Sequence, residues 1–180
     1  MSILNAITSG AGGVALSGDT SGNLIIQSAG ANVVTFTANG MVTNAGVPAF
    51  SIYLSASSQS LTSNTWTKVT LDGTTFNTAS SMVSSSRFTP TIAGYYQFSG
   101  ECWFSGASVC ISSLYKNGGV YVYGTRVDGG TTYSSSVNEL VYLNGSTDYI
   151  EMYAYTGSAG QNLANGSTFT RLTGCLVRSA

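Results

Sequence analysis

Short apolar segments separated by turn-forming residues run along the whole chain. The clearest pattern lies in residues 95–104, where the side chains alternate between two faces. One face carries Tyr96, Phe98, Cys102 and Phe104, and the other carries Tyr95, Gln97, Glu101 and Trp103. A period of two is that of a β-strand. Because both faces are largely apolar or aromatic, we expect a strand that is covered on both sides.

The same alternation predicts further strands at residues 49–54, 66–71, 109–116, 120–127, 136–143, 147–155 and 168–178. Asn117-Gly118-Gly119 and Asn144-Gly145-Ser146 separate two pairs of them and are typical of hairpin turns. Asp72-Gly73 and the Ser/Thr-rich segment up to Ser86 predict a turn and a long loop. About eight to ten strands without a helical pattern predict an all-β sandwich or jelly roll.

The first 47 residues differ from the remainder. They contain one charged side chain, Asp19, and short apolar segments such as Leu24-Ile25-Ile26 and Val33-Val34 at strand-plus-turn spacing. Strands this short cannot bury both faces within one chain, so we expect residues 1–47 to be an arm that is ordered in an oligomer or on a larger surface. A flexible Gly/Ser linker is the alternative. Pro48 begins a denser region, and residues 48–180 are predicted to be a separate head.

Composition narrows the possible functions. Charged residues make up 7% of the chain, against roughly 25% in an average soluble domain, and there is no histidine. Histidine-dependent nucleophiles and histidine-ligated metals are therefore excluded. A net charge of -1 argues against nucleic-acid binding, and no apolar run is long enough to cross a membrane. A lone sandwich with this sequence would expose much apolar surface, so we expect a homo-oligomer in which one sheet is covered by other copies.

The cysteines and the first residues predict the site of assembly. Cys102, Cys110 and Cys175 are an odd number and lie in apolar strand-like segments, so we expect reduced, buried thiols. The first residues show no basic segment and no apolar signal-peptide region. Both observations predict assembly in a reducing cytoplasm.

Several short motifs in this order resemble the C1q-like globular domain, the jelly roll of the C1q and tumour-necrosis-factor superfamily. They are Ala49-Phe50-Ser51, Arg87-Phe88-Thr89-Pro90, Ala93-Gly94-Tyr95-Tyr96-Gln97-Phe98, Leu114-Tyr115-Lys116-Asn117-Gly118, Tyr142-Leu143-Asn144-Gly145 with Asp148-Tyr149-Ile150-Glu151-Met152-Tyr153, and Thr173-Gly174-Cys175-Leu176-Val177. The resemblance covers residues 49–178. It implies an all-β C1q/TNF-like head that forms a homotrimer, with residues 1–47 serving attachment and trimerisation.

The sequence departs from that family in two ways. It has no collagen stalk, which argues against a complement-like role, and Cys175 stands where the family usually has an aromatic residue. The arm, from Thr8-Ser9-Gly10 to Gly18-Asp19 and again at Ser21-Gly22-Asn23-Leu24, resembles segments that recur in structural proteins of tailed bacteriophages. The resemblance therefore implies a phage virion protein.

Candidate chemistry is sparse, and we predict that the protein is not an enzyme and has no cofactor. Three glutamates and four aspartates could supply a carboxylate pair for glycoside hydrolysis. For Glu101 and Glu139 we favour contacts with Arg171, Arg178 or polar groups at a trimer interface. The residues predicted at that interface are Tyr95, Glu101, Trp103 and Arg171. The aspartates are scattered without a calcium-loop spacing, and only a site on the trimer axis stays open.

Tyrosines provide the remaining candidate site. Tyr121, Tyr123, Arg126 and Tyr133 are predicted to form a recognition surface, since exposed Tyr beside Asn and Ser is typical of such surfaces. The alternative is that these tyrosines simply cover the outer sheet.

Two functions follow. The first is a trimeric capsid decoration (cement) protein, bound to the major capsid protein by its arm. The second is the tip of a tail fibre or spike, attached to a tail component and recognising a host surface glycan. Both place the protein in a virion assembled in the bacterial host cytoplasm.

Overall fold

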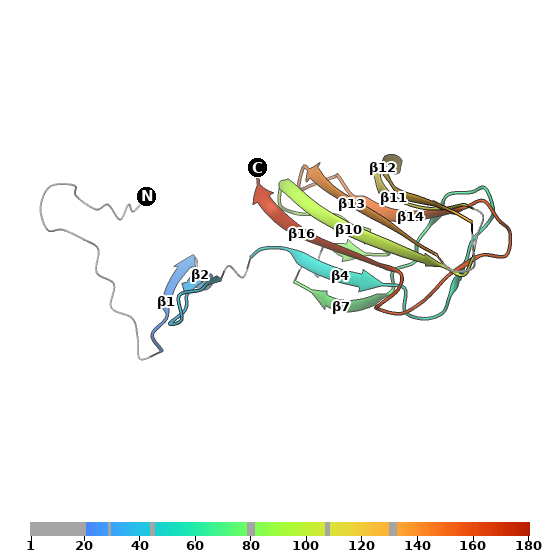
Figure 1. Cartoon of the computed structure of the whole chain (residues 1–180). Helices are drawn as coiled ribbons and strands as arrows, with labels where there is room; N and C mark the ends of the chain where they lie inside the picture. The colour runs from blue at the N-terminus through green and yellow to red at the C-terminus, as the bar shows by residue number, and fades with distance from the viewer. Residues whose placement is uncertain (1–20, 29, 44–45, 79–81, 107–108, 130–132) are drawn as a thin grey trace, which may run out of the picture. The chain divides into compact units, whose positions relative to one another are not determined.

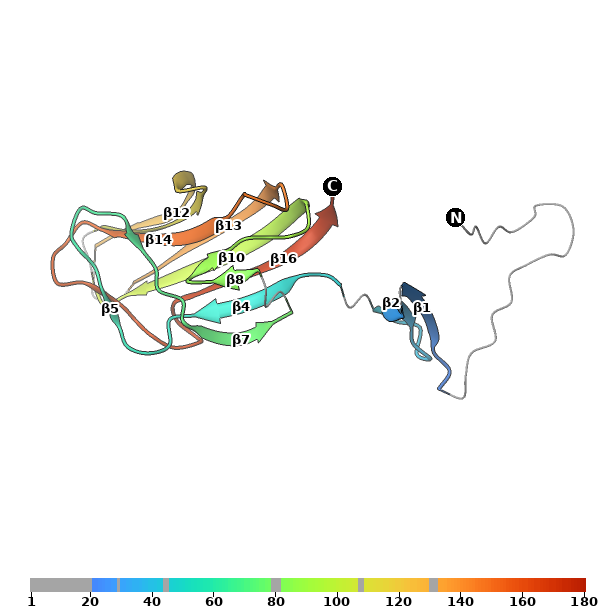
Figure 2. The same cartoon turned by 180° about the vertical axis from the view of Figure 1, so that it is seen from behind.

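The computed structural model describes residues 21–28, 30–43, 46–78, 82–106, 109–129 and 133–180 (Figures 1 and 2). Every regular element in these ranges is a β-strand, and every pairing between them is antiparallel. The chain divides at Val47/Pro48 into two compact units. The arm segments predicted between residues 8 and 19 lie outside the described residues.

The first unit contains a small sheet in the order β1 (Leu24–Ser28), β2 (Ala31–Phe36) and β3 (Val42–Thr43). Its exposed apolar side chains include Ile25, Ile26, Val33, Phe36, Met41 and Val42. Ile25 and Ile26 are neighbours on one strand and therefore point to opposite faces. Both faces of this sheet thus present apolar side chains to solvent.

The second unit is built of two sheets. The first, called here the β10 sheet, has the order β5 (Gln59–Ser60), β15 (Asn162–Leu163), β10 (Gly94–Phe104), β16 (Arg171–Ser179), β4 (Ala49–Tyr53) and β7 (Gly73–Asn77), and β13 (Tyr133–Leu143) also pairs with β10. The second, called the β11 sheet, has the order β12 (Gly119–Asp128), β11 (Val109–Lys116), β14 (Ile150–Thr156), β9 (Arg87–Phe88) and β8 (Val83–Ser84), and β6 (Thr67–Lys68) pairs with β14.

Aromatic side chains join the two sheets in the core. Phe88 of β9 stacks on Phe50 of β4, with 4.8 Å between the ring centroids. It also meets Tyr96 and Phe98 of β10 edge-on, at 5.2 and 5.7 Å. These residues are almost completely buried, and the Tyr96 hydroxyl donates to the carbonyl oxygen of Ile92 at 2.8 Å. The core therefore depends on contacts between segments that are far apart in the sequence.

The predicted all-β sandwich is confirmed, and so is the division of residues 95–104 between two faces, because Tyr96, Phe98, Cys102 and Phe104 are buried. The turn at Asn117-Gly118-Gly119 joins the paired strands β11 and β12. Asn117 and Gly118 both have positive φ, of 54° and 82°, as a tight two-residue hairpin turn requires.

Other predictions about the strands are wrong. Asn144-Gly145-Ser146 is not a hairpin, because β13 pairs with β10 whereas β14 pairs with β11; this turn leads from one sheet to the other. The predicted loop at residues 72–86 contains β7 and β8, and the predicted strand at 66–71 is reduced to Thr67–Lys68. Strand β7 has a single large apolar residue, Phe76, and so no alternating pattern that predicts a strand. It forms because its backbone pairs with β4.

The start of one strand and the exposure of one cysteine also differ from expectation. Strand β13 begins at Tyr133, three residues before the predicted start at Ser136, because it pairs with β10 along its whole length and draws in Ser134 and Ser135. Cys102 and Cys110 are buried as predicted, but Cys175 is exposed. Its neighbour Gly174 takes the inward position of β16, beside the buried rings of Phe50 and Phe98.

The close approach of β12 to β13 depends on Gly124. A Cβ added there would overlap the carbonyl oxygen of Ser136 and lie 2.5 Å from Oγ of Ser112. Gly119 on the same strand has room, since its nearest neighbour would lie at 3.8 Å. We expect Gly124→Ala to destabilise the fold by about 1–3 kcal/mol through overpacking, and Gly119→Ala to change stability by less than about 0.5 kcal/mol.

Urea and thermal denaturation followed by circular dichroism would measure both variants. Equal stability of the two would contradict the proposed role of Gly124.

Candidate functional site: two exposed sheet faces

The outward side of the β10 sheet, called here the first face, is rich in exposed apolar side chains. It carries Phe76 of β7, Tyr95 of β10, Leu140 and Tyr142 of β13, and Val177 of β16. Tyr95 and Tyr142 lie opposite each other on paired strands, with ring centroids 5.4 Å apart. Several exposed apolar side chains gathered on one side of a sheet are typical of a face that contacts another molecule.

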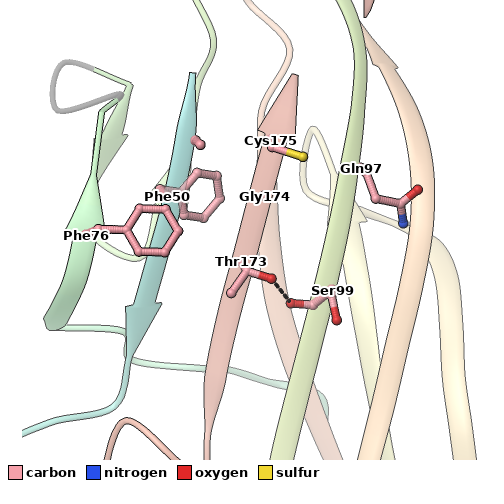
Figure 3. Close-up of a pocket in the computed structure, with 8 residues that line it drawn as sticks. Phe50, Phe76, Gln97, Ser99, Thr173, Gly174 and Cys175 are labelled. Carbon is pink, nitrogen blue, oxygen red and sulfur yellow. Dashed lines mark hydrogen bonds between the residues drawn. The ribbon is translucent and has the colours of Figure 1, made fainter. Parts of the chain in front are cut away.

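A shallow hollow of about 200 Å³ lies on this face between β7, β4, β16 and β10 (Figure 3). Figure 3 shows Phe76 on β7, Phe50 on the adjacent strand β4, and Thr173 and Cys175 on β16. Thr173 donates its hydroxyl hydrogen to the carbonyl oxygen of Ser99 at 3.1 Å. No charged side chain is among the residues that line it: Ala49, Phe50, Phe76, Gln97, Ser99, Thr173, Gly174 and Cys175. A hollow with this lining is better suited to accept an apolar side chain of another molecule than to catalyse a reaction.

Polar contacts on the first face join three of the residues predicted for a trimer interface. Glu101 and Arg171 are partners on adjacent strands, and their side chains form an ion pair at 3.3 Å. The indole nitrogen of Trp103 donates to Glu101 at 2.8 Å. Tyr95 lies on the same face towards the other end of β10. All four residues therefore share one face, and their role between copies of the chain stays a prediction.

The outward side of the β11 sheet, called the second face, carries an aromatic cluster made of Trp66, Tyr115, Tyr123, Tyr153 and Tyr155. Trp66 lies at its centre, with ring centroids 5.4 Å from Tyr123, 5.3 Å from Tyr155 and 6.1 Å from Tyr115. Tyr115 stacks in turn on Tyr153 at 3.8 Å. Neighbouring strands place these rings in contact, since β6 pairs with β14, and β14 with β11.

A second hollow, of about 250 Å³, lies in this cluster and is lined by Trp66, Ile111, Tyr123, Arg126 and Tyr155. Two residues of the predicted recognition surface, Tyr123 and Arg126, therefore lie together. Tyr121 is exposed but outside the lining. The prediction for Tyr133 is wrong: it packs against the core from the inward side of β13, and its hydroxyl is buried.

Sequence reasoning did not assign Trp66, Ile111 or Tyr155 to this site. The alternation that places Tyr153 and Tyr155 on one side of their strand is visible in the sequence. The position of Trp66 is not, because it depends on the two-residue strand β6 pairing with β14 across more than 80 residues.

No protein-family model matches the sequence, and no curated protein matches it. Solved structures do. The globular domain of zebrafish complement 1qA is 16% identical, with 74% of this chain and 99% of that chain covered and a TM-score of 0.56. Murine APRIL is 11% identical, with 73% and 99% covered and a TM-score of 0.59. The PRD1 vertex protein P5 is 16% identical, with 74% and 99% covered and a TM-score of 0.55.

The fold is a C1q/TNF-like jelly roll. The similarity covers about three quarters of the chain, and at these identities it establishes the fold. The resemblance inferred from the order of short motifs is thereby confirmed at the level of architecture.

The two buried thiols of the jelly roll are poorly suited to nucleophilic chemistry. Burial raises the pKa of the Cys102 thiol far above its ordinary value, and burial together with the charge of Asp128 raises that of Cys110 to about 11. Neither thiol is therefore a nucleophile at neutral pH. Among the described residues no three His, Cys, Asp or Glu side chains lie close enough to hold a metal ion. The described residues also contain no helix long and apolar enough to span a membrane.

One buried carboxylate lies on the second face, beside the aromatic cluster. Glu151 is 2% exposed and accepts hydrogen bonds from Lys68 at 2.7 Å and Arg87 at 2.8 Å. The guanidinium of Arg87 also lies over the ring of Tyr149, 3.8 Å from its centroid. Burial alone raises the pKa of Glu151, but the hydrogen bonds and positive charges of Lys68 and Arg87 outweigh it and hold that pKa below its ordinary value.

Glu151 should make the stability of the jelly roll dependent on pH. Because its pKa is lower in the folded chain, its contribution is complete above the unfolded pKa near 4.5 and is lost as the pH falls through the folded value. We expect Glu151→Gln to destabilise the protein by about 1–3 kcal/mol at pH 7, since Lys68 and Arg87 are partly exposed and stay solvated. The loss should shrink towards pH 3.

Differential scanning calorimetry between pH 7 and pH 3 would test this, with Glu139→Gln as the control. Glu139 accepts a local hydrogen bond from the amide of Leu140, so its variant should melt like the wild type at each pH. A Glu151→Gln variant with the wild-type pH dependence would refute the assignment.

Proposed function

We propose that this protein is a non-enzymatic structural component of a bacteriophage virion, a homotrimeric decoration protein of the capsid. In this proposal the arm attaches the trimer to the major capsid protein and the jelly-roll head projects from the shell. Assembly takes place in the bacterial cytoplasm.

The fold and the arm support a virion role together. One of the similar structures is named as a vertex protein, P5 of PRD1, and it shares the jelly roll over 99% of its own length. The motifs of the arm resemble segments of phage structural proteins. A comparison of folds does not carry function by itself, so the proposal rests on the head and the arm in combination.

The exposed apolar residues of the first face support a trimer. These exposed aromatic and aliphatic residues lie along the strands β7, β16, β10 and β13, and proteins with this fold typically associate as trimers. Two further copies of the chain would cover these side chains, and the Glu101–Arg171 pair would lie among them. Burial of apolar area then provides the free energy of association.

The small sheet of β1, β2 and β3 supports an arm that associates with other chains. A sheet of this size with apolar side chains on both faces has little core of its own. Packing against the arms of two other copies, or against the capsid surface, would bury Ile25 on one face and Ile26 on the other.

The second candidate is the tip of a tail fibre or spike that recognises a host glycan. The aromatic cluster of the second face, with Tyr123 exposed on it, and the hollow beside Tyr123 favour this candidate. The head and the trimer would be the same in both candidates, and the place of the protein in the virion separates them.

Trimer formation through the first face can be tested with two tyrosines of similar exposure. Tyr95 on the first face is 44% exposed and Tyr121 on β12 is 47% exposed. We expect Tyr95→Glu to dissociate the trimer at micromolar concentration, because it would bury a charge against apolar neighbours, and Tyr121→Glu to leave it intact. Analytical ultracentrifugation measures both. A wild-type protein that sediments as a folded monomer would overturn the proposal.

Copy number tests the virion role itself. Quantitative mass spectrometry of purified particles, relative to the major capsid protein, should give a near-stoichiometric ratio for a decoration protein. A few trimers per particle would instead identify the tail-tip candidate, and absence from the particles would exclude both.

A further inference from the structure

We propose that the hollow on the second face, between Tyr123, Trp66 and Arg126, is a binding site for one ring of a neutral saccharide. The inference deepens the second candidate function and rests on it only for the biological source of the ligand. As a property of the head, the site would exist in a capsid decoration protein as well.

The aromatic part of the site is held in place before any ligand arrives. Tyr123 is 59% exposed, and its ring stacks on Trp66 with 27° between the ring planes. Tyr155 also packs against Trp66, with 5.3 Å between the ring centroids, and donates its hydroxyl hydrogen to Oδ1 of Asn64 at 3.0 Å. A rigid, exposed aromatic surface suits the flat C–H face of a pyranose ring and loses little conformational entropy when it binds.

The polar part of the site matches the hydroxyl groups of a sugar. Every hydroxyl group is both a donor and an acceptor, so neighbouring hydroxyls are best met by a donor and an acceptor side by side. Arg126 lines the hollow. Asp128 lies two residues further along β12, next to the lining residues, and its carboxylate contacts Nε of Arg126 at 3.0 Å. Both hydrogen bonds from Arg126 to Asp128 use Nε. The terminal amino groups of the guanidinium have no hydrogen-bond partner among the described residues, and we assign them to the ligand.

Charge and size favour a neutral sugar over other ligands. The positive charge of Arg126 is balanced by Asp128, so the hollow offers no excess charge to a phosphate or an acidic sugar. Its volume of about 250 Å³ falls below the roughly 300–1,000 Å³ of pockets that enclose drug-sized ligands. It would therefore hold a single ring of a longer chain. An anchoring side chain of a peptide or protein partner would need a deeper apolar pocket than this open hollow provides.

The second face is also accessible in the assembly proposed above. The two sheets pack through their inward sides, so the first and second faces point away from each other. A trimer formed through the first face leaves one saccharide site per chain. Three sites on one trimer would strengthen weak binding to a repetitive polysaccharide through multivalency.

Isothermal titration calorimetry of the full chain would test the site. The neutral probes are maltohexaose, mannohexaose and chitohexaose, and the acidic probe is hexagalacturonic acid. We expect at least one neutral probe to bind, and Tyr123→Ala to weaken that binding about tenfold, or 1.4 kcal/mol. Tyr121→Ala is the matched control, since it removes an exposed tyrosine of the same strand from outside the hollow, and it should bind within twofold of wild type.

A second pair of variants tests the polar half. Arg126→Gln should weaken binding at least about threefold, whereas Arg178→Gln, on β16 of the other sheet, should not. Thermal melts of all variants show whether they are folded, and exposed side chains such as these should alter the melting temperature little.

Several results would overturn the inference. They are no binding of any neutral probe at millimolar concentration, binding of the acidic probe alone, or an equal effect of Tyr123→Ala and Tyr121→Ala. Failure here leaves the proposed virion role untouched, because copy number and oligomeric state are measured without reference to the hollow. Conversely, absence from virions with intact saccharide binding would overturn the virion role alone.

Discussion

The contact of Phe88 with Phe50, Tyr96 and Phe98 is the interaction on which the rest of this head depends. It joins β9 of one sheet to β4 and β10 of the other, with ring centroids 4.8–5.7 Å apart. Once these rings are buried, the alternation of each strand decides which side chains must point outward. Tyr95, Glu101 and Trp103 are outward because Tyr96, Phe98 and Cys102 are inward. Both exposed faces are thus consequences of how the core is packed.

The two faces differ in their chemistry. The first is broad and apolar, with one ion pair at 3.3 Å among aromatic and aliphatic neighbours. The second has its aromatic rings stacked on one another and is bordered by the Glu151 network with Lys68 and Arg87. An apolar face gains most from complete burial against a protein surface, whereas fixed rings beside paired charges suit a small polar ligand. This contrast is why we assign association to one face and recognition to the other.

Few charges also limit how the protein could act. With 7% charged residues, long-range electrostatic attraction contributes little to any encounter, and recognition must come from shape, stacking and hydrogen bonds. The same composition leaves apolar side chains on both faces of the small β1–β2–β3 sheet. An arm and a head that each present uncovered apolar surface are consistent with a protein that works as part of an assembly.

Local patterns in the sequence determined a large part of this structure: the two faces of residues 95–104, the hairpin at Asn117-Gly118 and the all-β class all follow from period and turn chemistry between near neighbours. Tertiary structure decided the rest. Trp66 enters the aromatic cluster because β6 pairs with β14, Tyr133 turns inward because β13 pairs with β10 along its whole length, and Cys175 is exposed because Gly174 takes the inward position beside Phe50. In each case the deciding partner is distant in the chain, and the nearest of them, Phe104 opposite Tyr133, lies 29 residues away. A local sequence pattern does not show which distant strand will supply the hydrogen bonds and the packing surface.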